Sequence, residues 1–200
     1  MEVNEKAGLN FPKACRALLR QDPDIILIGE IRDQETAKMA IQSALAGTLL
    51  LSSIHAKNAI STIDRIISLG VERFWASSAI SAIIAQRLIR KLCPYCKVEV
   101  KSTRQEQALF QLPKNSTLYQ KTGCKVCHGS GYLGRECLAE LLPITSELEQ
   151  GINDAWSPQK IDAYAKKAGM IRFLEEAKKK LLAGTTTVTE IAHVLGIPLC

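Results

Sequence analysis

The chain has 200 residues and a formal net charge of +6, and 46% of its residues are apolar. This composition is typical of a soluble globular protein. Its apolar stretches are interrupted before the ~18 residues that a bilayer span needs, and its N-terminus lacks the apolar core of a signal peptide, so we expect neither feature.

Charge and aromatic content argue against a nucleic-acid interface. Lysines and arginines are scattered along the chain, and only 5% of the residues are aromatic. Proteins that stack bases interleave aromatic side chains with a basic stripe. The positive charge is compatible with acidic lipid headgroups or an acidic protein partner, and ordinary solvated helix faces explain it most simply.

The first half of the chain alternates strand and helix signals at the spacing of βαβ units, which predicts the latter part of a parallel sheet with flanking helices. The apolar run 25–28, which Pro23 and Gly29 bound, predicts a fully buried strand. A second buried strand is expected over residues 48–54. The expected helices lie between Pro12 and Pro23, over residues 34–46 behind an Asp33 N-cap, from Ile60 through Ile63 and Ile67 to Gly70, and over residues 75–92.

The character of the sequence changes at Cys93. Residues 93–135 hold two cysteine pairs, several glycines and a polar connection over residues 101–121. A short strand over residues 137–142 then precedes a helical tail. Its helices are expected from Ser157 to Gly169, over residues 171–183, and after a capping box formed by Thr187 and Glu190. We therefore expect three parts, residues 1–92, 93–135 and 136–200.

The two cysteine pairs are the most specific chemical signal in the sequence. Each CxxC places two thiolates on one tight knuckle, and two knuckles complete the tetrahedron that Zn²⁺ prefers. We expect Cys93, Cys96, Cys124 and Cys127 to form a closed structural zinc site, with the connection between the pairs as an insertion. A redox role for either pair is the alternative, and His128 is the one credible substitute ligand.

Other residues around these pairs receive weaker predictions. The site's negative charge would be offset by Lys97, Lys125 and Arg135. The remaining cysteines have no spaced partner and are expected to be buried or incidental thiols; they are Cys15, Cys137 and Cys200. Seven cysteines without a signal peptide favour metal binding or reduced thiols over disulfides.

Glu30 lies just past the carboxyl end of the strand expected over residues 25–28, where open α/β sheets bind their ligands. A carboxylate at this position can align an attacking water or help to hold Mg²⁺ beside a phosphate; a plain surface acid is the alternative. His55 follows the second strand and can reach the same crevice, unless it is a packed or solvent-exposed histidine. A structural role is expected for Asp24, and ion pairs or solvated helix ends explain Arg32, Asp33, Gln86 and Arg87.

Three strings of residues resemble one family, the ATPases of the type II secretion and type IV pilus systems. LLRQDPDIILIGEIRD resembles their Walker B region, LSSIHAKNA their histidine box, and AQRLIRKLCPYC the entry to their tetracysteine module. The histidine box departs from the family pattern at Thr48, Ala56 and Asn58, where the family usually has histidine, threonine and aspartate. These departures leave the fine tuning of the site open.

The resemblance implies a fold and a set of partners. It implies a partial RecA-like P-loop NTPase core that binds ATP and Mg²⁺, followed by the tetracysteine module and a small helical C-terminal region. Glu30 would be the Walker B glutamate, and His55, with Arg32, would sense the nucleotide. The family forms a homo-hexamer in the cytoplasm that docks on a platform protein at the inner face of the cytoplasmic membrane, with no nucleic acid.

The phosphate-cradling motif GxxxxGK[ST] is absent from the sequence. The family places this loop upstream, so we expect the carboxyl-terminal portion of a hexameric ATPase of the assembly and secretion branch, with little ATP hydrolysis by itself. Two alternatives stay open: a non-catalytic zinc-binding interaction module derived from such an ATPase, and a fragment of a RecA-like nucleic-acid motor.

Overall fold

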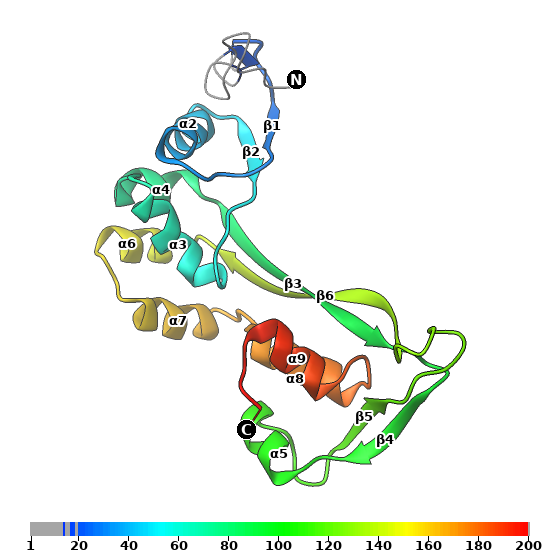
Figure 1. Ribbon diagram of the computed structural model, residues 1–200. Helices are drawn as coiled ribbons and strands as arrows, with labels where there is room; N and C mark the ends of the chain where they lie inside the picture. The colour runs from blue at the N-terminus through cyan, green and yellow to red at the C-terminus, as the bar shows by residue number, and fades with distance from the viewer. Residues whose placement is uncertain (1–13, 15–16, 19, 200) are drawn as a thin grey trace. The chain divides into compact units, whose positions relative to one another are not determined.

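The computed structural model describes residues 14, 17–18 and 20–199 (Figure 1). The chain divides into two compact units: Met1–Ala85 with Leu141–Gly169, and Gln86–Glu140 with Met170–Cys200. The helix expected between Pro12 and Pro23 falls partly outside the described residues; within that range residues 14, 17 and 18 are helical.

The first unit holds the strand and helix alternation that the sequence predicts. Its elements are β1 (Ile25–Ile28), α2 (Gln34–Leu45), β2 (Leu49–Ser52), α3 (Ala59–Ser68), α4 (Arg73–Ala79), the start of β3 (Ala82–Leu92), the end of β6 (Tyr132–Pro143), α6 (Ser146–Asn153) and α7 (Pro158–Lys167).

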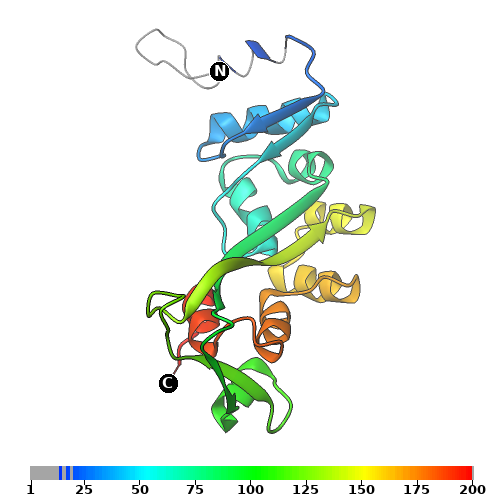
Figure 2. The ribbon, with the colours of Figure 1, turned by 90° about the vertical axis from the view of Figure 1, so that its right-hand side faces the viewer.

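Strands β1 and β2 are parallel, as predicted, and pair in register from Ile25 with Leu49 to Ile28 with Ser52. Helix α2 covers one face of this sheet (Figures 1 and 2). Ile26 and Ile28 point toward it and pack against Met39 and Ala40.

The prediction that both strands are fully buried is wrong. Ile25 and Leu27 are 61% and 77% exposed, and Leu49 and Leu51 are also exposed. The strands of a parallel sheet usually have continuously apolar sequences because helices cover both faces of the sheet. Here the described residues cover only one face, so every second apolar side chain of β1 faces solvent.

The ends of α2 follow the predicted capping signals. The Asp33 Oδ1 atom accepts a hydrogen bond from the Thr36 N–H at 2.9 Å, which satisfies one of the free donors of the first turn. Beyond the C-cap lies Gly47 with a φ of 102°, a conformation that favours glycine. The opposite side of α2 packs against α3 and α4 in a second apolar cluster, made of Ala37, Ile41, Ile66, Val71 and Ala76.

The prediction of a helix over residues 75–92 is wrong beyond Ala79. Helix α4 ends there, and the chain continues as β3, which pairs with β6. The apolar spacing of four residues that suggested a helix is also even, so it fits one face of a strand equally well. Ile83 and Ile84 add β-branched side chains, which favour a strand, and β6 supplies the backbone partners.

The second unit contains the remainder of β3 and β6 and a compact set of shorter elements. These are β4 (Lys97–Lys101), α5 (Arg104–Phe110), β5 (Thr117–Lys121), α8 (Phe173–Leu182) and α9 (Val188–Leu195). Helices α8 and α9 pack side by side, and α8 also contacts α5 and β5 (Figure 1).

The connection over residues 101–121 is more ordered than the sequence suggested. Strands β4 and β5 form an antiparallel pair, and α5 lies between them in the chain. Thr103 and Glu106 form a reciprocal capping box at the start of α5, and the side chain of Phe110 is buried. This Thr-x-x-Glu signal was available in the sequence and predicts the helix.

The three predicted C-terminal helices form, with one difference in capping, and the structure adds α6, which was not predicted from the sequence. Helix α7 begins after Ser157, which is its N-cap, as the sequence predicts. At α9, Thr187 Oγ1 accepts from the Glu190 N–H at 3.1 Å, which is half of the predicted capping box. The other half does not form, because the Glu190 carboxylate binds Arg90 instead. Over the described part of the chain, no helix has both the length and the apolar character to cross a bilayer.

Candidate functional site

The parallel register of β1 and β2 brings Glu30 and His55 to the same edge of the sheet. Ile28 pairs with Ser52, so both strands end together, and the two side chains follow within three positions. The loops after the strands are tied to each other by Ser53. Its carbonyl accepts from the Ile31 N–H at 2.8 Å, and its hydroxyl donates to the Gly29 carbonyl at 2.7 Å.

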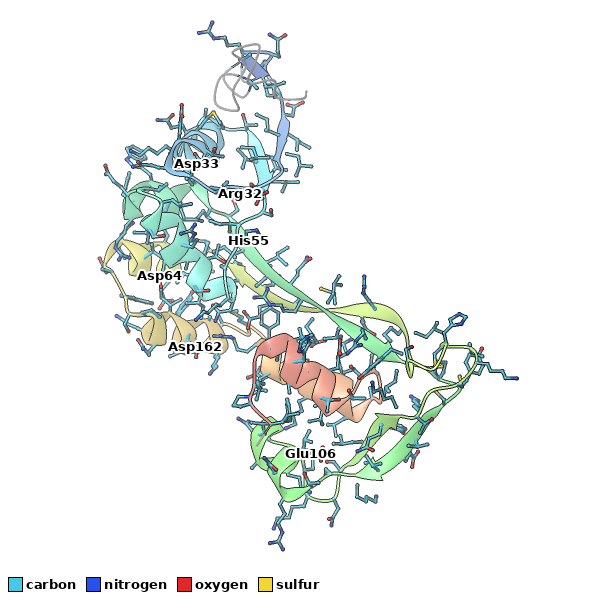
Figure 3. The ribbon with its side chains drawn as sticks, viewed as in Figure 1. Arg32, Asp33, His55, Asp64, Glu106 and Asp162 are labelled. Atoms are coloured by element: carbon cyan, nitrogen blue, oxygen red, sulfur yellow. The ribbon has the colours of Figure 1, made fainter. Side chains whose placement is uncertain are left out.

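Glu30 contacts Arg32 and His55, the two residues that were predicted to sense the nucleotide. Arg32 Nη2 lies 2.5 Å from Glu30 Oε1, and His55 Nε2 lies 3.5 Å from Glu30 Oε2. Figure 3 shows Arg32 and His55 on the loops that follow the two strands. The structure therefore places these three side chains in one cluster at the carboxyl ends of two parallel strands.

The cluster is open to solvent, and the Glu30 carboxyl favours its ionised form. The side chain of Glu30 is 33% exposed, whereas those of Arg32 and His55 are 72% and 92% exposed. The hydrogen bond from Arg32 is the largest influence on the Glu30 carboxyl and lowers its pKa, partial burial opposes it, and the charges of Arg32 and His55 lower the pKa further. A carboxylate held in this form accepts hydrogen bonds, and its two exposed partners have room to turn toward a ligand.

Neighbouring residues that the sequence singled out have other roles. The carboxylate of Asp33 caps α2 (Figure 3). The Asp24 carbonyl accepts the Leu49 N–H at 3.0 Å at the beginning of the sheet. Gln86 and Arg87 lie on β3 and not at the end of a helix, and the Arg87 guanidinium stacks on the Phe173 ring.

One departure from the family's histidine box has a structural explanation. Asn58 is the N-cap of α3: its Oδ1 atom accepts from the Ser61 N–H at 2.8 Å, and Ser61 completes a capping box. Asparagine and aspartate are equally good at this position. The change therefore preserves the helix that follows His55. Nothing in the structure explains Ala56 or Thr48.

The four predicted cysteines converge in the second unit. Their Sγ atoms all lie within 4.8 Å of one another. Three of the distances are shorter: 3.9 Å from Cys93 to Cys124, 3.8 Å from Cys96 to Cys127, and 3.7 Å from Cys124 to Cys127. A tetrahedron with Zn–S bonds of ~2.3 Å has S···S edges of about 3.8 Å. The donor set and its spacing fit a tetrathiolate metal centre.

Backbone amides favour a thiolate at one of these positions. Cys127 Sγ accepts from the N–H groups of Cys124 and Gly131, each at 3.2 Å. Burial raises the pKa of this thiol, but these donors and the neighbouring thiols outweigh it and bring the pKa to about 6. At Cys93, burial dominates and raises the pKa to about 11. Metal ligation requires the deprotonated form, so Cys127 is prepared for it.

The residues around the cysteines are placed as follows. His128 is exposed and is not part of the four-ligand group. Lys97 Nζ donates to the Gly184 carbonyl at 3.0 Å, and the amine lies 4.5 Å from the centre of the Tyr119 ring. That Lys97 offsets the negative charge of the thiolates stays a prediction. Cys137 is exposed, so of the two expected roles, a buried or an incidental thiol, it fits the incidental one. The other two unpaired cysteines lie outside the described residues.

Comparison with solved structures identifies the fold. The pilus retraction motor PilT with bound ADP superimposes with a TM-score of 0.64 at 24% identity, over 92% of this chain and 43% of that chain. The ATPase DotB of Legionella pneumophila gives a TM-score of 0.62 at 19% identity, over 94% of this chain and 42% of that chain. The fold is that of part of such ATPases.

Sequence comparison gives the family. The model of the type II/IV secretion system proteins matches residues 1–193, and the chain belongs to this family. It is 41% identical over 194 residues to the type IV pilus assembly ATPase PilB of Thermus thermophilus, covering 95% of this chain and 22% of that protein. It is 39% identical over 196 residues to the type II secretion system protein E of Pseudomonas aeruginosa, covering 96% and 39%. The chain thus spans less than half the length of these relatives.

Proposed function

We propose that this chain is the part of a type IV pilus assembly or type II secretion ATPase that carries its catalytic carboxylate, its phosphate-sensing histidine and a structural zinc centre. The observation that carries the proposal is the cluster of Glu30, Arg32 and His55 at the carboxyl ends of two parallel strands. Family membership supports it independently.

Glu30 is the catalytic residue of this proposal. Phosphoryl transfer depends on positioning and charge stabilisation, and a carboxylate fixed at a strand end can orient a water molecule for attack. Glu30 is a carboxylate whose pKa is lowered further by Arg32, so at neutral pH it can accept the hydrogen bond of that water. ATP and Mg²⁺ supply the phosphoryl group and the metal charge when they are bound. Arg32 and His55 are exposed enough to reach a phosphate from the same edge.

The zinc centre is structural in this proposal. Its ligands would be Cys93, Cys96, Cys124 and Cys127, which leave no open coordination position for chemistry. Two of the cysteines are buried, as expected of a centre that holds segments of chain together. Zinc binding would then contribute directly to the folding free energy of the second unit.

The proposal extends to the assembly. We place the complete protein in the cytoplasm as a homo-hexamer, peripheral at the inner face of the cytoplasmic membrane, docked on a platform protein and without nucleic acid. The names of the relatives, a type IV pilus assembly ATPase and a type II secretion system protein, support the link to these two systems. The exposed apolar face of the β1–β2 sheet also supports the proposal, because the remainder of an ATPase core would cover such a face.

The catalytic role is tested in the native gene product that contains this chain. Glu30→Gln preserves the shape of the side chain and removes its charge, so ATP hydrolysis should fall at least 100-fold, within the ~10²–10⁴ range of positioned proton-transfer groups. Glu72→Gln is the matched control, because Glu72 is exposed and makes no capping hydrogen bond. Full hydrolysis by the Glu30→Gln protein would remove Glu30 from the mechanism.

A second candidate is a zinc-binding interaction module without catalysis, which the cluster of four cysteine Sγ atoms favours. This module would bind Zn²⁺ and a protein partner, and ATP with Mg²⁺ would leave its melting temperature unchanged. A nucleotide-dependent rise in melting temperature of the native product would exclude it.

A further inference from the structure

Residues 184–190, which join α8 to α9 and form the first turn of α9, contact the chain on both sides of the first cysteine pair. The Leu92 N–H donates to the Thr185 carbonyl at 2.8 Å. On the other side of the pair, Lys97 Nζ donates to the Gly184 carbonyl at 3.0 Å. The first knuckle is therefore held at both of its ends by the same C-terminal segment.

The same segment also reaches the second cysteine pair. The hydroxyls of Tyr132 and Thr187 are hydrogen-bonded at 2.8 Å in a buried position. Tyr132 follows Gly131, whose N–H donates to Cys127 Sγ at 3.2 Å and whose carbonyl accepts from the Cys93 N–H at 3.0 Å. Thr187 thus fixes the start of β6, which leaves the second knuckle. It thereby also supports Gly131, which links the second knuckle to the first.

Glu190 completes the connection with a buried carboxylate. Its Oε1 atom accepts from the Arg90 N–H at 2.9 Å, and its Oε2 atom accepts from Arg90 Nε at 2.8 Å. The Arg90 guanidinium stacks 4.2 Å above the Tyr132 ring, so one carboxylate orients residues that lead to both knuckles. Thr186 adds a hydrogen bond from its hydroxyl to the Arg90 carbonyl at 2.8 Å.

We propose that Glu190 and Thr187 are positioning residues for the metal centre and that docking of α9 and metal binding strengthen each other. The proposal rests on the metal site proposed above. A tetrathiolate centre binds more tightly when both knuckles are already held at the correct separation, because less ordering free energy is then spent on binding, and residues 184–190 supply contacts to both. Because the coupling is thermodynamic, it must act in both directions.

Zinc affinity is the first readout, measured on the reduced chain by competition with a chromophoric chelator. Glu190→Gln and Tyr132→Phe should each weaken Zn²⁺ binding by about 10- to 100-fold, the usual effect of removing a group that orients metal ligands. Tyr132→Phe removes one hydroxyl and keeps the ring beneath Arg90, so it remains informative if Glu190→Gln does not fold.

Glu140→Gln is the matched control. The Glu140 carboxylate is also buried, and it accepts from Arg172 Nε at 2.9 Å and from the Phe173 N–H at 3.0 Å. It therefore has the same kinds of partner as Glu190, but these partners belong to the start of α8 and not to the knuckles. We expect this variant to lose thermal stability while its Zn²⁺ affinity changes less than about 2-fold.

Hydrogen exchange supplies the reverse measurement. Chelation of the metal from the wild-type chain should accelerate amide exchange in α9, whereas α7 of the other unit should exchange at an unchanged rate. Equal Zn²⁺ affinity in wild type, Glu190→Gln and Tyr132→Phe, or unchanged exchange in α9, would overturn the positioning role alone. A wild-type chain that binds no Zn²⁺ would overturn the proposed metal centre itself.

Discussion

Truncation of two adjacent residues of β1 should have very different costs in the 200-residue chain. Ile28 is 2% exposed and packs beneath α2, whereas Leu27 is 77% exposed on the opposite face. Ile28→Ala removes buried carbon atoms and should lower the free energy of unfolding by about 2–5 kcal/mol. Leu27→Ala removes atoms that are already largely in water, so its cost should be about 1 kcal/mol or less.

Urea denaturation followed by circular dichroism measures both values, with the slope of the transition as a check that each variant unfolds in the same way. Equal costs for Ile28→Ala and Leu27→Ala in this chain would refute the assignment of the two faces. In a complete ATPase, where we propose that the rest of the core covers the second face, Leu27→Ala should cost about as much as Ile28→Ala.

Three further predictions concern charge and metal. Arg32→Gln should raise the pKa of the Glu30 carboxyl toward 4.5, because Arg32 is the largest cause of its lowering; a carboxylate NMR titration that shows no change would contradict the contact. Cys124→Ser should abolish stoichiometric Zn²⁺ binding by native mass spectrometry, whereas Cys137→Ser should retain it, and the reverse result would exclude the ligand set. Burial raises the pKa of Glu190, but the hydrogen bonds and charge of Arg90 outweigh burial and hold this pKa below 4.5. The ionised Glu190 should therefore stabilise the fold above pH 4.5, and this stabilisation should be lost as the pH falls through the lowered pKa of the folded state. Equal loss of stability on acidification in wild type and Glu190→Gln would contradict this.

The sequence predicted the candidate site better than it predicted the fold around it. Glu30 and His55 follow short apolar runs, and the parallel pairing that brings them together follows from the βαβ spacing. The cysteine spacing likewise predicted a cluster that the structure confirms. In both cases the candidate site residues lie next to local sequence signals, so the sequence alone was sufficient to predict that they are close in space.

Two of the failures, at β3 and at the capping box of α9, share a different cause, which is a partner that lies far away in the sequence. Strand β3 was mistaken for a helix because its apolar spacing is ambiguous and its partner β6 begins about 40 residues later. The capping box at Thr187 was only half correct, because Arg90 competes for the Glu190 carboxylate from 100 positions away. Such competition depends on tertiary structure, and local patterns contain no information about it.

The native gene product, captured from its own cells with an antibody to this segment, gives the most direct test of the central claim. Its mass and its ATP hydrolysis are measured on the same sample. We expect a product well above 22.0 kDa that hydrolyses ATP with Mg²⁺. A product of 22.0 kDa that neither binds nor hydrolyses ATP would contradict the claim that this chain acts as part of a secretion or pilus ATPase.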